Sequence, residues 1–171
     1  MQEWTFVDKK GWPDGPWHIE PDKVQWVDPE TGLDCLIHRN QFGALCGYVG
    51  VPPGHKYHGL GYDSVDVDAH GGLTFAAFCA ENTEECGRGI CHIPEEGRPD
   101  QVWWLGFDCA HAWDYVPGMP MSAIFSSSEA VYRDIGYVKR EVRALAKQLS
   151  EVGKQEEEQH EMSTRRSSGS N

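Results

Sequence analysis

The stretch KVQWVDPETGLDCLIHRNQFGALCGYVGV, residues 23–51, decides the fold. Three runs of strand length, at residues 23–28, 33–38 and 44–51, are separated by the turn sequences DPETG and NQFG. Asparagine, aspartate, proline and glycine favour tight turns, and apolar runs bounded by such turns are typical of β-hairpins. The stretch therefore predicts an antiparallel meander of three strands.

Further strands are expected on both sides of this meander. Residues 73–79 and 102–109 are apolar runs of strand length, and a short run at residues 5–7 precedes a segment rich in glycine and proline. Proline and glycine at that density do not continue a helix or a central strand. We therefore expect an antiparallel sheet of about six strands within residues 4–110.

The C-terminal part of the chain predicts one long amphipathic helix. Apolar residues recur there in steps of four and three, at Val131, Ile135, Val138, Val142, Leu145 and Leu149. Ser126 and Glu129 have the spacing of a capping box, so the helix is expected from about Glu129 to Leu149. The stripe is short for a coiled coil, which favours a helix that covers its own sheet over a dimer seam. The predicted fold class is α+β, and both a monomer and a homodimer stay open.

The length of 171 residues suits a single packed core. We expect one α+β domain over residues 1–152, followed by a disordered tail at residues 153–171, where apolar residues are scarce. No apolar run is long enough to span a membrane, and the start of the chain does not resemble a secretory signal. A cytoplasmic protein is the expectation.

Charge excludes one class of partner. The net charge is −12, and the excess lies in residues 1–128, where seven basic residues face nineteen acidic ones. This acidic part of the chain repels the phosphate backbones of nucleic acids, so nonspecific nucleic-acid binding is not expected. Carboxylates gathered for a cation and an acidic surface for a basic partner both remain possible readings.

Six cysteines in a chain without an export signal are expected to be reduced thiols. Cys35 and Cys46 lie in apolar runs and are expected in the core. The other four do not form the paired C-x-x-C knuckles of zinc ribbons, so zinc binding and disulfide formation stay open as minor alternatives for Cys79, Cys86, Cys91 and Cys109.

Histidine and aspartate supply the remaining chemical signal, because the sequence holds no phosphate-binding loop, nucleophile elbow or dinucleotide fingerprint. The motifs are H-x-x-H from residue 55, D-x-D-x-H-G-G from residue 66 and D-x-x-H-x-x-D from residue 108. Imidazoles and carboxylates at strand ends are the mixed donors that Zn, Mn or Fe accept, so a divalent metal ion is expected.

Roles follow from the residue types. The candidate metal ligands are His55, His70, Asp108 and His111. Asp66 and Asp114 are the candidate catalytic carboxylates, acting as a base or orienting an imidazole. Tyr62 and Trp104 are candidate ligand-binding aromatics. The glycines at positions 71 and 72 allow a ligand to approach the backbone beside His70.

Four phrases of the chain resemble a family of uncharacterised proteins encoded in bacteriophage genomes. They are CGYVGVPPGH (46–55), DVDAHGGLTF (66–75), WWLGFDCAH (103–111) and YRD (132–134), and the resemblance spans most of residues 12–150. The family brings no established activity. It implies an intracellular phage product, such as an accessory or counter-defence protein.

Two classes of function stay open. The first is a metal-dependent hydrolase of a phosphoester or nucleotide-like small molecule. The second is a non-enzymatic inhibitor or sequestering protein that binds a host protein or a nucleotide signal. Bound metal distinguishes the two classes.

Overall fold

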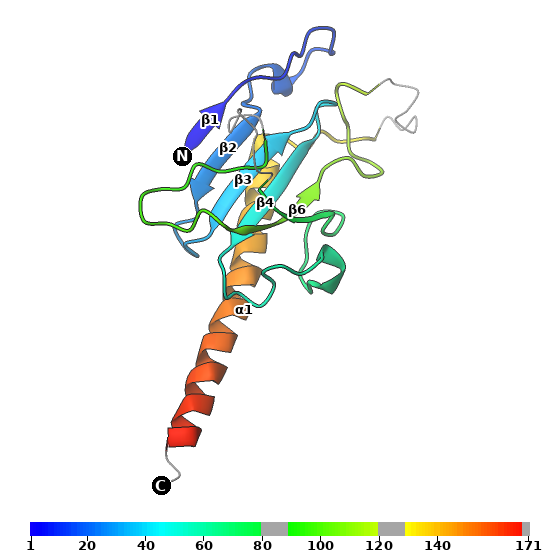
Figure 1. Cartoon of the computed structure of the whole chain (residues 1–171). Helices are drawn as coiled ribbons and strands as arrows, with labels where there is room; N and C mark the ends of the chain where they lie inside the picture. The colour runs from blue at the N-terminus through cyan, green and yellow to red at the C-terminus, as the bar shows by residue number, and fades with distance from the viewer. Residues whose placement is uncertain (80–88, 120–128, 169–171) are drawn as a thin grey trace.

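A computed structural model describes residues 1–79, 89–119 and 129–168. It contains one six-stranded antiparallel sheet in the order β1-β2-β3-β4-β6-β5, with a single α-helix, α1, behind it (Figure 1). The bounds are Gln2–Trp4 (β1), Lys23–Val27 (β2), Asp34–Arg39 (β3), Leu45–Val51 (β4), Phe75–Phe78 (β5), Trp103–Asp108 (β6) and Ile135–Ser168 (α1). The predicted α+β fold is confirmed.

The meander of β2, β3 and β4 forms as predicted, with Trp26 paired to Cys35 and Cys35 paired to Val49. β5 and β6 also lie within the predicted runs, and β6 pairs with β4 inside the sheet. The first strand is not at residues 5–7 but at β1. The backbone N–H groups of Phe6 and Val7 instead donate to the Asp22 carboxylate, both at 2.8 Å, so this stretch leaves the sheet.

Both faces of the sheet are covered. One face packs on α1 through an apolar core that includes Ile37, Val49, Leu105, Val142 and Leu145. The other face carries a second cluster, which lies under an irregular segment that begins at residue 89 and crosses in front of the strands in Figure 1. Here Lys23 donates to the Cys91 carbonyl and Gln25 pairs with the backbone of Ile93. The alternation of polar and apolar residues in β2 therefore marks two buried faces.

α1 begins later than the sequence predicts. The Asp134 carboxylate accepts the Tyr137 N–H at 2.7 Å, and the Glu20 carboxylate accepts the Ile135 N–H at 3.0 Å, so these two acidic groups cap the helix. The predicted start at Glu129 is thus wrong, and Ser126 of the predicted capping box lies outside the described residues.

The apolar stripe of α1 is confirmed from Val138 to Leu149, whose stripe positions are buried, whereas Val131 precedes the helix and is exposed. α1 continues to Ser168, through a segment whose composition predicts disorder. Side chains after Gly153 lie outside the described residues, so the independence of this tail from the core stays a prediction.

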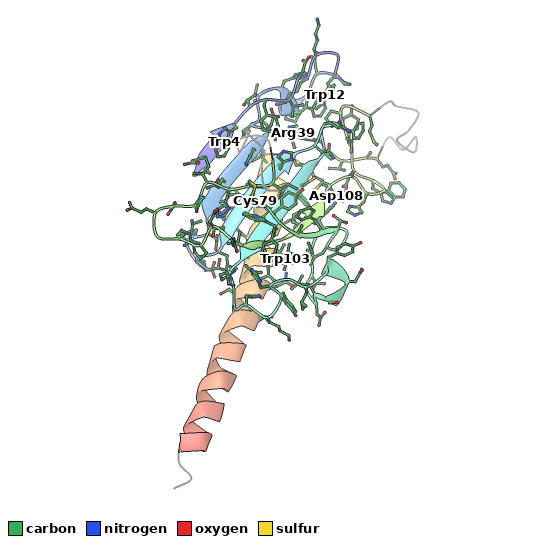
Figure 2. The ribbon with its side chains drawn as sticks, viewed as in Figure 1. Trp4, Trp12, Arg39, Cys79, Trp103 and Asp108 are labelled. Atoms are coloured by element: carbon green, nitrogen blue, oxygen red, sulfur yellow. A yellow bond between two sulfur atoms is a disulfide. The ribbon has the colours of Figure 1, made fainter. Side chains whose placement is uncertain are left out.

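A buried charge network ties the N-terminal segment to the sheet. Arg39 at the end of β3 donates to Asp22 and Glu20, each at 2.9 Å, and to the Tyr132 hydroxyl at 2.6 Å (Figure 2 labels Arg39). Lys9 reaches the same Asp22 carboxylate at 2.7 Å. This network holds Tyr132, the residue before Arg133, and so fixes the approach to α1.

Cys35, Cys46 and Cys109 are buried free thiols, which confirms the core prediction for the first two. Cys79 and Cys91 form a disulfide with Cα atoms 4.9 Å apart, so the expectation of six reduced thiols is wrong for this pair. Cys86 lies outside the described residues. Within the described residues, no helix is long and apolar enough to cross a membrane.

Candidate metal centre

His70, His111 and Asp114 meet at one place in the structure. Each offers one ligand atom, and the three atoms lie within 4.8 Å of one another. His70 comes from the segment after residues 65–69, whose apolar side chains pack on the core, and the other two residues come from the turn that follows β6. Figure 2 labels Asp108 at the end of β6 from which this turn departs.

A tight turn places His111 and Asp114 on the same side. The Asp114 N–H donates to the His111 carbonyl at 3.0 Å, and Trp113 between them has φ 77°. A left-handed backbone at tryptophan costs on the order of 1–3 kcal/mol, so the surrounding structure must impose it. Val131 does so, because its N–H and C=O pair with the backbone of Trp113 and Tyr115 at 2.8 and 3.0 Å.

The His111 ring lies directly against the backbone of Gly71. Gly71 has φ 66°, and a Cβ added there would lie 2.3 Å from a ring carbon of His111. A side chain at this position would displace the imidazole. The first glycine of the HGG motif is therefore needed because its lack of a side chain makes room for the His111 ring.

Asp114 is held as a carboxylate anion. Its side chain is almost fully buried, and burial by itself would raise its pKa, but hydrogen bonds from Arg133 and His70 together with the His111 N–H lower it. Arg133 Nε donates to Oδ1 at 2.8 Å, while His70 Nε2 lies 2.8 Å and the His111 N–H nitrogen 3.1 Å from Oδ2. The carboxylate is therefore charged and oriented before any ion binds.

Tyr137, in the first turn of α1, orients His70 from the other side. Its hydroxyl oxygen lies 2.9 Å from His70 Nδ1, opposite the contact between Nε2 and Asp114. When Nε2–H donates to Asp114, Nδ1 accepts from the Tyr137 hydroxyl; a metal at Nε2 would require the other tautomer, in which Nδ1–H would donate to Tyr137. Metal-bound histidines commonly have such a partner for the second ring nitrogen, which fixes the tautomer and the ring orientation.

Two of the three distances between the ligand atoms are close to those expected around a shared divalent ion. Ligand atoms on one tetrahedral ion lie about 3.3 Å apart when the bonds to the ion are about 2.0–2.1 Å long. His70 Nε2 is 2.8 Å and His111 Nδ1 is 3.7 Å from Asp114 Oδ2, so both distances lie within about 0.5 Å of that value. His111 Nδ1 is also buried without a hydrogen-bond partner among the described residues.

Asp108 borders the cluster. Its Oδ1 lies 3.8 Å from His111 Nδ1, and its side chain is about one-third exposed. Thr74 Oγ1 and the Ala110 N–H each donate to this carboxylate at 3.0 Å. Asp108 is thus beside the three converging residues without being within ligand distance of all of them.

The structure does not bring His55 to the cluster. His55 Nε2 bonds the Leu149 carbonyl at 2.9 Å, and Nδ1 accepts the Tyr57 N–H. Leu149 lies twelve residues after Tyr137, which is about 18 Å along α1. His55 fastens the loop after β4 to the far part of the helix.

The remaining candidates also lie elsewhere. Asp66 is exposed on the segment before His70, and Tyr62 is exposed in the short 3₁₀ helix Tyr62–Ser64. Trp104 is fully buried in the cluster on the sheet face away from α1, where its ring contacts His92 edge-on. None of the three makes a contact with the cluster in the described part of the chain.

Sequence reasoning missed Arg133 and Tyr137. Tyr137 lies in the first turn of α1, and Arg133 precedes the helix by two residues. In the sequence, Arg133 is noted only as part of the phrase YRD, and Tyr137 is not singled out. No spacing relates them to His70 or Asp114.

Comparison of the chain with protein-family models, with curated proteins and with solved structures finds no match.

Proposed function

We propose that the protein is a metal-dependent hydrolase of a phosphoester or nucleotide-like small molecule. The observation that carries this proposal is the convergence of the ligand atoms of His70, His111 and Asp114 at one place. His111 Nδ1 is buried, makes no hydrogen bond with a described residue and lies 3.7 Å from Asp114 Oδ2, so a cation bound between the two residues would give this nitrogen a partner.

The donor set favours zinc, manganese or iron. Two imidazole nitrogens and one carboxylate oxygen are typical ligands of these ions, and three protein ligands leave a position for water, as in catalytic sites. The Arg133–Asp114 and Tyr137–His70 hydrogen bonds hold two of the ligands in place.

The chemistry follows from these positions. A divalent ion lowers the pKa of its bound water towards neutrality. Asp108, beside the cluster and partly exposed, is placed to accept a proton from a water molecule held there. The water oxygen would bond to phosphorus as the bond from phosphorus to the ester oxygen breaks, and the proton held by Asp108 would pass to the departing oxygen. Such an activity also suits an accessory or counter-defence protein of a phage.

Elemental analysis of protein purified without a metal-affinity tag tests the proposal. We expect about one metal ion per chain in the native protein and in His55→Ala, and loss of the ion together with hydrolysis in His70→Ala. His18→Ala is a matched control, because His18 is an exposed histidine bonded only to the Pro13 carbonyl in the described structure.

Two results would contradict the proposal: a native protein that takes up no ion after incubation with zinc, and a folded His70→Ala variant that retains phosphoesterase activity. The first result would favour the sequestering protein, in which the same residues hold a ligand by hydrogen bonds alone.

A further inference from the structure

Two arginines lie against Tyr137, the residue that orients His70. The guanidinium carbon of Arg133 is 4.9 Å from the centre of the Tyr137 ring, and that of Arg140 is 5.8 Å from it. Arg133 precedes α1 and Arg140 follows Tyr137 by three residues, so all three side chains gather at the start of the helix. The ring of Tyr137 therefore has two guanidinium groups beside it at the start of α1.

The guanidinium of Arg133 is held in place, but only some of its N–H groups make hydrogen bonds. Its Nε donates to Asp114 Oδ1 at 2.8 Å, and the Tyr137 ring supports the guanidinium plane. Its terminal nitrogens make no hydrogen bond with residues 1–79, 89–119 or 129–153, and one quarter of the side chain is exposed. Arg133 thus presents terminal N–H donors beside Asp114, one of the three candidate metal ligands.

Arg140 differs from its neighbours on α1. Lys139 lies over the Trp26 ring and Arg143 faces Asp28 with Nε 3.7 Å from the carboxylate. Arg140 makes no ion pair with a described residue, and its contact is the Tyr137 ring. In a chain of net charge −12, an unpaired arginine beside an arginine with free donors marks a place for an anion.

We infer that Arg133 and Arg140 bind the non-bridging oxygens of a phosphate ester whose further oxygen is held by the metal at His70, His111 and Asp114. This inference rests on the proposed function and assigns two residues to the binding of the phosphoryl group of its substrate. Planar guanidinium forks match phosphate oxygens, and a tetrahedral anion offers enough acceptors to engage two arginines and an ion together. A neutral ester or amide does not offer enough acceptor oxygens to engage two arginines and an ion together.

Calorimetric titration of the full-length protein with inorganic phosphate, with and without zinc, tests the inference. Arg140→Gln removes one cation without touching Asp114, and Arg133→Lys keeps a donor near Asp114 while removing the fork. Arg143→Gln is the matched control, since it removes the same charge from the same helix at a residue that faces Asp28.

We expect phosphate affinity to fall about tenfold or more in Arg140→Gln and in Arg133→Lys, as is usual when a charge-assisted hydrogen bond is lost. Affinity in Arg143→Gln should stay within about twofold of the native value, because a single exposed charge is largely screened by salt. The zinc content of Arg140→Gln should equal that of the native protein.

Equal weakening in Arg140→Gln and Arg143→Gln would overturn the inference, because general electrostatics would then explain the binding. Zinc-loaded native protein that does not bind phosphate would also overturn it while leaving the metal centre intact. Phosphate binding that depends on both arginines in a protein that takes up no zinc would instead support the anion site and contradict the proposed hydrolase.

Discussion

The contact between the His111 ring and the backbone of Gly71 makes the substitution Gly71→Ala a test of the metal centre. The added Cβ would lie 2.3 Å from a ring carbon, whereas carbon atoms pack at about 3.5–4.0 Å. The ring must therefore move by more than about 1 Å, and metal-ligand bonds tolerate only about 0.2 Å. His111 should lose its place as a ligand.

Gly72→Ala is the matched control. Gly72 also has a left-handed backbone, with φ 88°, but an added Cβ would meet nothing within 4 Å. Both variants carry the cost of placing alanine in this conformation, about 1–2 kcal/mol, which lowers the Tm by a few degrees. Only Gly71→Ala carries the clash with His111.

A competition titration against a chromophoric zinc chelator, paired with thermal unfolding, measures both effects. We expect a Tm lower by a few degrees in Gly72→Ala, a somewhat larger loss in Gly71→Ala because of the clash, and a zinc affinity at least about tenfold weaker in Gly71→Ala than in Gly72→Ala. Equal zinc affinity in the two variants would show that His111 is not a ligand in the position the structure gives it.

Three further variants test other parts of the structure. Tyr137→Phe should weaken zinc binding about 10–100-fold, because the Nδ1 of His70 loses its partner, while circular dichroism shows an unchanged fold. Asp22→Asn should cost about 3–5 kcal/mol in denaturant unfolding, since it leaves Arg39 and Lys9 with an unbalanced buried charge. Burial of Asp22 would by itself raise its pKa, but the hydrogen bonds from Lys9 and from the N–H groups of Val7 and Phe6 lower it. The ionised Asp22 therefore stabilises the native state above about pH 4, and this stabilisation is lost as the pH falls through the pKa of Asp22 in the native state. The acid-induced loss of stability should accordingly be shallower in Asp22→Asn. Deletion of residues 154–171 should leave the Tm within about 2 °C of the native value, because that segment offers little apolar surface to bury, and a drop of many degrees would show that it docks.

The sheet and the helix stripe could be predicted because their signals are local. Turn residues bracket β3, and the apolar steps of α1 depend only on helical periodicity. The position of β1 could not be predicted in this way, since it depends on Asp22 capturing the N–H groups of Phe6 and Val7 from about sixteen residues away. The alternation of apolar and polar residues does not show that a carboxylate, here that of Asp22, takes the place of a neighbouring strand.

The residues of the candidate site could likewise be predicted only as far as local signals allow. His70, His111 and Asp114 could be selected by residue type, but which histidines converge is decided by tertiary packing. His55 has the same chemistry and lies some three turns of α1 away, bound to the Leu149 carbonyl. Trp104 faces the other side of the sheet because of the register of β6. Only contacts between distant segments distinguish these residues.

The cluster joins three segments that otherwise have few reasons to stay together: the stretch ending at His70, the turn after β6 and, through Arg133 and Tyr137, the start of α1. A cation bound there would act as a cross-link that forms only in the folded chain. At a free concentration 100 times its dissociation constant it would add about 2.7 kcal/mol to the stability of the native state. The thermal stability of the domain would then rise and fall with the metal supply of its surroundings, independently of any catalysis.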